Sequence, residues 1–149
     1  MRKTITWVLV ADGKRARVYK NEGPGKGLTP ALDREYIAVL EPTRKMVSDR
    51  QGRAFDSHGV GRHAMEPHTD PQRYEKLRFA RQVAEELESY KQKGAFDRLV
   101  IAAAPKTLGD LRGELSPAVQ AAVLGAVAKD LTKVPMAELA DHFHDVFPA

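Results

Sequence analysis

The sequence predicts a single α/β domain, residues 1–149, in which a mixed β-sheet packs against helices. Residues 4–10 and 97–104 carry apolar and β-branched side chains almost without interruption, which is typical of strands buried on both faces. The stretch from Pro71 to about Lys93 repeats its apolar residues at helical spacing. Of the 149 residues, 42% are hydrophobic and 30% are charged, so a sizeable core can form without disulfide bonds.

The first forty residues are expected to form an antiparallel meander of strands over 4–10, 14–20 and 34–40, with a glycine- and proline-rich loop over 21–33. Asp12-Gly13 is the pair favoured by a two-residue type I′ turn, although Asp12 could instead be a catalytic carboxylate at the end of a strand. Alternation in the second strand puts three side chains on one face, those of Arg15, Arg17 and Tyr19.

The long helix follows residues 41–70, which lack periodicity and are expected to be a functional loop. We predict that the helix ends at Gly94, since glycine is common just after a helix. Its buried stripe is predicted to consist of Leu77, Ala80, Val83, Ala84 and Leu87.

After the strand over 97–104, we expect a short helix behind Pro105 and a turn opened by Ser116-Pro117. A last strand is predicted over 122–129, and Pro135 is expected to open a final helix. The apolar face of that helix would comprise Met136, Leu139, Ala140, Phe143 and Phe147. The predicted order is therefore β-β-β-loop-α-β-α-β-α.

The net charge of +4 is modest, but basic residues are concentrated in the first twenty positions and in the first half of the long helix. That helix has its acidic residues later, whereas the helix dipole favours the reverse order. A surface that faces an anionic partner would account for this arrangement, and so would an ordinary solvated face. The residues involved are Arg73, Lys76, Arg78 and Arg81.

Within the long loop, Gly59-Val60-Gly61-Arg62 is a candidate for phosphate contact. Two glycines allow the backbone to approach a ligand closely, and an arginine fork matches phosphate oxygens. His63 follows directly and is a second candidate. The alternative interpretation is a flexible turn.

Three histidines recur every five residues in the same loop, namely His58, His63 and His68. Together with nearby carboxylates they could bind a divalent ion and support hydrolysis, but their spacing matches no established metal motif. We expect no cofactor. The chain has no cysteine, which excludes disulfides and thiolate metal sites.

Four strings of residues resemble the bacterial host attachment protein family, whose members are described as required for attachment to host cells. The strings are Arg53-Ala54-Phe55-Asp56-Ser57, Gly61-Arg62-His63-Ala64, Phe96-Asp97-Arg98-Leu99-Val100 and Lys129-Asp130-Leu131-Thr132. The resemblance covers nearly the whole chain.

The order of elements also resembles the central domain of archaeo-eukaryotic peptide release factors and Pelota. Arg78-Phe79-Ala80-Arg81 stands where those factors begin a helix after their long loop. This resemblance implies a ribonuclease H-like fold and contact with the ribosome or tRNA. The chain lacks the Gly-Gly-Gln tripeptide, however, so the release-factor reaction is not implied.

No stretch approaches the ~20 apolar residues of a membrane span, and no signal peptide is recognisable, so we expect a cytoplasmic protein. The leading hypothesis is a module that contacts the ribosome, tRNA or another RNA. It would bind through Gly59, Gly61, Arg62, His63, Arg78, Arg81, Arg15 and Arg17. The alternatives are a hydrolase that uses the loop histidines and a protein-interaction module that acts indirectly in attachment.

Overall fold

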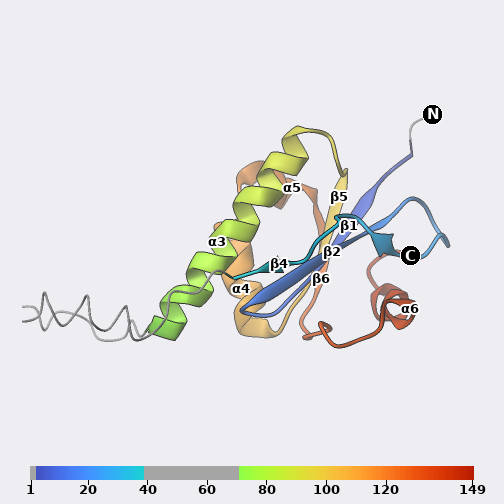
Figure 1. Cartoon of the computed structure of the whole chain (residues 1–149). Coiled ribbons are helices and arrows are strands. Elements are labelled where there is room, and N and C mark those ends of the chain that lie inside the picture. Colours follow the sequence, from blue (N-terminus) through green and yellow to red (C-terminus); the bar gives the residue numbers. More distant parts are fainter. Residues whose placement is uncertain (1–2, 39–70) are drawn as a thin grey trace, which may run out of the picture.

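A mixed β-sheet is the centre of the protein (Figure 1), and the computed structural model describes residues 3–38 and 71–149. The sheet has six strands in the order β3-β2-β1-β5-β6, with β4 paired to β2 beside β3. Its strands are β1 (Thr6–Ala11), β2 (Arg15–Asn21), β3 (Thr29–Pro30), β4 (Tyr36–Ile37), β5 (Arg98–Ala102) and β6 (Val123–Val127). The expected mixed α/β fold class is confirmed.

The middle of the sheet is its most buried part. β1 pairs antiparallel with β2 and parallel with β5, and β5 pairs parallel with β6. Every residue of β1 is buried, which explains why its sequence is almost uninterrupted by charge. The sequence therefore placed both central strands correctly.

Two details of the N-terminal half differ from the prediction. The third strand is the two-residue β4, and a further short strand, β3, forms within the predicted loop over 21–33. Both pair antiparallel with β2, β3 near its C-terminal end and β4 near its N-terminal end. The predicted loop over 41–70 lies outside the described residues.

The turn between β1 and β2 is not type I′. That turn needs positive φ at both central residues, but Gly13 is not among the glycines with positive φ, and no described non-glycine residue has one. Instead, Asp12 Oδ1 accepts hydrogen bonds from the backbone N–H groups of Lys14 and Arg15, at 2.7 and 2.8 Å. The aspartate therefore organises the turn through its side chain.

Helix α3 (Pro71–Gln92) crosses one face of the sheet. It ends in a Schellman motif, since Gly94 has φ 76° and the N–H groups of Gly94 and Ala95 bond back to the last turn. Leu77, predicted to be buried, is only partly buried, whereas Phe79 is buried. At the N-terminal end of the buried stripe, Phe79 therefore takes the place that was predicted for Leu77.

Helices α4 (Pro105–Glu114) and α5 (Pro117–Ala122) cover the same face as α3 (Figure 1). Ser116 caps α5 by accepting a hydrogen bond from Val119 N at 3.2 Å. These helices bury a cluster that includes Trp7, whose ring centroid lies 4.8 Å from that of Phe96.

The opposite face is covered by the C-terminal segment, α6 (Met136–Leu139) and the 3-10 helix η1 (Ala140–Phe143) (Figure 1). Leu139, Phe143 and Phe147 are buried there against β1 and β5, as predicted. Met136, predicted to join them, is 43% exposed. The single final helix of the prediction is instead one short α-helical turn followed by a 3-10 turn, and Met136 stands exposed at its first residue.

Candidate functional site

The predicted binding residues that the structure describes fall into two separate places. Arg15 and Arg17 lie on β2 and line a groove against the segment after β6. Arg78 and Arg81 lie on α3, which packs on the other face of the sheet (Figure 1), and line a smaller pocket. The loop candidates Gly59, Gly61, Arg62 and His63 and the possible metal ligands His58 and His68 lie outside the described residues.

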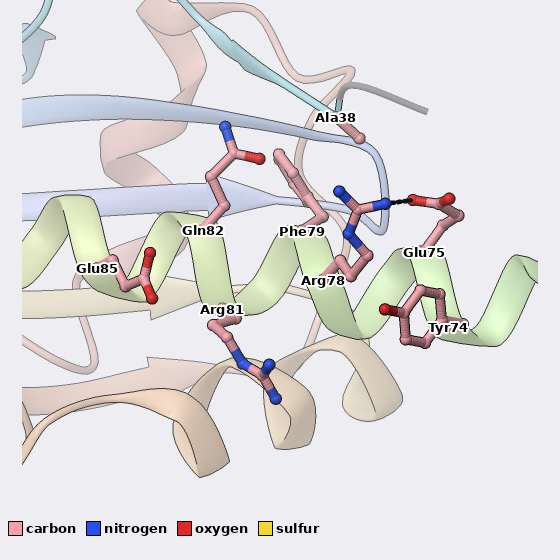
Figure 2. A pocket seen from close by; sticks show the side chains of 8 residues that line it. All are labelled: Ala38, Tyr74, Glu75, Arg78, Phe79, Arg81, Gln82 and Glu85. Atoms are coloured by element: carbon pink, nitrogen blue, oxygen red, sulfur yellow. Dashed lines mark hydrogen bonds and ion pairs between the residues drawn. The ribbon is translucent and has the colours of Figure 1, made fainter. Parts of the chain in front are cut away.

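The pocket on α3 has a volume of about 230 Å³ and lies beside Ala38, at the end of the described part of the N-terminal half (Figure 2). Arg78 Nη1 lies 3.4 Å from Glu75 Oε1, and the Arg78 guanidinium lies 5.8 Å from the centre of the Tyr74 ring. Arg81 points away from Arg78 toward α4 and pairs with Glu114 there at 3.2 Å. Both cations of this pocket are therefore partly neutralised within the chain.

Glu75 is a residue of this pocket that the sequence analysis missed. It is only 7% exposed, and its Oε2 atom has no hydrogen-bond partner among the described residues. A signal was present in the sequence, because Glu75 precedes Phe79 by four residues and so belongs to the stripe that continues through Val83 and Leu87.

Two basic residues in the first half of α3 pair with carboxylates of α4. Arg73 forms two parallel hydrogen bonds with Asp110, at 2.6 and 2.7 Å, and Arg81 pairs with Glu114 one turn further along α4. These carboxylates offset the positive side chains, which the helix dipole disfavours at that end. An external anion is therefore not needed to account for the charge order of α3.

The groove beside β2 is larger, about 670 Å³, and more basic. Three cations line it, Arg15, Arg17 and Lys133, against one lining carboxylate, that of Asp12. The remaining lining residues are Tyr19, Thr132, Val134, Pro135 and Met136. Lys133 was not predicted, although it directly follows the Lys129–Thr132 string on which the family resemblance rests.

Hydrogen bonds hold the two walls of this groove together. Arg17 donates from Nε to Glu35 at 3.0 Å and from Nη1 to the carbonyl of Thr132 at 3.4 Å, so it bridges β2 and the segment after β6. Asp130 Oδ1 accepts from both the amide and the hydroxyl of Thr132, at 2.9 and 2.5 Å. The neighbouring Leu131 is buried and fixes that segment in the core.

The groove cations differ in how free they are to bind a ligand. Hydrogen bonding to the Tyr19 hydroxyl and to the Glu35 carboxylate raises the pKa of Arg17. The Arg17 side chain is therefore held by contacts within the protein. Arg15 is exposed and forms no ion pair with any other described residue. The hydrogen bonds from Thr132 lower the pKa of Asp130, with a further contribution from the charge of Lys133. Arg15 and Lys133 are therefore the cations that a ligand could reach.

The histidines of the C-terminal segment form no metal site. His144 Nε2 lies 3.9 Å from Asp141 Oδ1. Within residues 3–38 and 71–149, no group of three histidine, aspartate or glutamate side chains is arranged to hold a metal ion. The predicted histidine loop is not part of these ranges.

Comparison with models of protein families shows which family the chain belongs to. The sequence model of the family described as "Protein required for attachment to host cells" matches residues 7–143. The chain belongs to this family. The match includes both walls of the β2 groove and the whole of α3, and a search of curated proteins found no match.

Solved structures resemble the fold at low sequence identity. The crystal structure of the archaeal translation termination factor aRF1 matches with a TM-score of 0.42 and 9% identity, covering 95% of this chain and 37% of that chain. A structure described as an archaeal protein matches with a TM-score of 0.44 and 10% identity, with coverage of 95% and 36%. This host-attachment family chain therefore spans little more than a third of either.

None of the helices within residues 3–38 and 71–149 combines the length and the apolar composition that crossing a bilayer requires.

Proposed function

We propose that this host-attachment family protein is a cytoplasmic module that binds RNA, with ribosomal RNA or tRNA as the expected partner, and that the β2 groove holds the phosphate backbone. The observation that carries the proposal is the set of cations on the groove walls, Arg15, Arg17 and Lys133. Phosphate contacts dominate the affinity of proteins for nucleic acids, so a groove of this charge suits a polyanion.

The charge balance of the groove lining favours an anion. Three lining cations face one lining carboxylate, while Glu35 pairs with Arg17 and Asp130 interacts with the charge of Lys133 from outside the lining. The Asp12 carboxylate is moreover engaged by two backbone N–H groups of the turn. Arg15 and Lys133 would contact phosphates, while Arg17 would keep the walls at the right separation.

Other residues would extend the contact. Arg78 and Arg81 can bind phosphate only by giving up Glu75 and Glu114, so we assign them a secondary part. Gly59, Gly61, Arg62 and His63 complete the proposal as the residues of the long loop that would approach the backbone.

The test is the salt dependence of binding. Fluorescence anisotropy with labelled tRNA, repeated across a series of KCl concentrations, gives the slope of log K against log salt. Removing two phosphate contacts in the variant Arg15→Ala/Lys133→Ala should reduce that slope by about 2 and weaken binding at low salt.

Lys26→Ala/Lys106→Ala is a matched control, since it removes the same charge from exposed positions outside the groove. It should change the slope much less. Absence of binding by the unaltered protein, or equal effects of the two double variants, would refute the proposal.

A further inference from the structure

The groove beside β2 has an apolar wall in addition to its cations. Val134, Pro135 and Met136 form this wall, opposite Arg15 and Arg17 on β2. Met136 is 43% exposed, although most large apolar side chains of the described chain are buried. The Tyr19 side chain, 7% exposed, also lines the groove. Phosphate binding alone gives no reason for an exposed apolar wall.

We infer that the groove receives an unpaired base, so that the RNA bound here is single-stranded, with its phosphates on Arg15 and Lys133 and one base against Pro135 and Met136. This inference rests on the proposed function and narrows its ligand. A volume of about 670 Å³ lies within the roughly 300–1,000 Å³ usual for sites that enclose small organic groups.

The chemistry of RNA explains why the apolar wall favours a single strand. In a duplex the faces of the bases are stacked on one another, and a protein meets phosphates, ribose hydroxyls and base edges. An unpaired base can leave the stack and offer its flat face to an apolar surface. A purely basic surface would bind both duplex and single-stranded RNA. A groove with one charged and one apolar wall binds the single strand more tightly, because an unpaired base can contact the apolar wall.

The apolar wall is preformed, which lowers the entropic cost of binding a base. The turn from Leu131 to Val134 is closed by a hydrogen bond from Val134 N to the Leu131 carbonyl at 3.0 Å. Glu138 N bonds to the Pro135 carbonyl at 2.9 Å and so fixes the start of α6. Leu139, which is fully buried, holds this wall against the sheet.

The test compares three labelled RNAs of the same length with the full-length protein: an unstructured single strand, its blunt duplex, and the single strand with abasic sites at its central positions. Anisotropy should show the intact single strand binding at least tenfold more tightly than the duplex and the abasic strand. Met136→Ser should weaken binding of the intact strand by about three- to tenfold and leave the other two RNAs unchanged.

Ile37→Ser is the matched control, because Ile37 is 56% exposed on β4 and does not line the groove. It should leave all three affinities unchanged. Equal, salt-sensitive binding of the single strand and the duplex would overturn the inference and leave the proposed function standing. An equal loss for intact and abasic strands with Met136→Ser would also overturn it. Failure of all three RNAs to bind would refute the proposed function itself.

Discussion

Gly125 on β6 lies against Val146 of the C-terminal segment, and this contact predicts the effect of adding one methyl group. A Cβ atom on Gly125 would lie 2.8 Å from Val146 Cγ1, closer than real Cβ contacts allow, so one of the two must move. Overpacking of this kind costs roughly 1–3 kcal/mol. Alanine in a strand recovers about 0.5–1 kcal/mol relative to glycine, because the unfolded chain has less freedom to lose. Gly125→Ala should therefore lower the free energy of unfolding by about 1 kcal/mol.

A second substitution should reverse the sign of this effect. Gly125 is not among the glycines with positive φ, so alanine fits its backbone once the valine is shortened. In a Val146→Ala background, Gly125→Ala should stabilise the protein by about 0.5 kcal/mol. Urea denaturation of the four proteins, followed by circular dichroism, gives the complete double-mutant cycle. If Gly125→Ala has the same effect in both backgrounds, the two residues are not in contact and the reasoning fails.

Three further predictions concern interactions between elements. Asp110→Asn should lower the free energy of unfolding by roughly 1–2 kcal/mol, because it weakens the paired hydrogen bonds with Arg73; chemical denaturation measures this, and an unchanged midpoint would contradict it. Ser116→Ala should cost about 1 kcal/mol through loss of the α5 cap and of the hydrogen bond from the Ser116 hydroxyl to Glu88, seen as a lower melting temperature; an unchanged melting temperature would contradict it. The pKa of Asp130 is lowered from its ordinary value of 3.8, so the ionised side chain should stabilise the protein above that pH and lose this contribution as the pH falls further. Asp130→Asn should therefore make stability fall less steeply with pH in the acid range. An unaltered dependence would show that the bonds to Thr132 are not formed in solution.

Local sequence signals were sufficient for the main elements. The continuous apolar runs identified β1 and β5, since a strand covered on both faces has no position for a charge. Gly94 marked the end of α3, because the left-handed conformation found there is open to glycine at little cost. Ser116 was predicted to open a turn, and the structure shows that it begins the helix α5, where its hydroxyl satisfies an amide that the helix itself cannot.

Burial near the ends of elements was less predictable. Helical spacing gave the correct face of α3 but assigned Leu77 rather than Phe79 to its stripe, because the neighbouring turn and α4 determine which side chain is enclosed. Met136 was assigned to the core, yet it is the first residue of α6 and is exposed, while Leu139 of the same turn is buried. Apolar spacing does not record where a helix begins to be covered by the sheet.

By itself, the sequence determined the order of the main elements, the two-sided burial of the central strands and the family to which the chain belongs. Only the tertiary structure decided which charges meet. It paired Arg73 with Asp110, 37 positions away, and brought Arg17 to Thr132, 115 positions away, to form the β2 groove. Such contacts depend on sheet register and on the packing of helices across the sheet. Local patterns fix neither, because each element's propensity is independent of the partner that it finally meets.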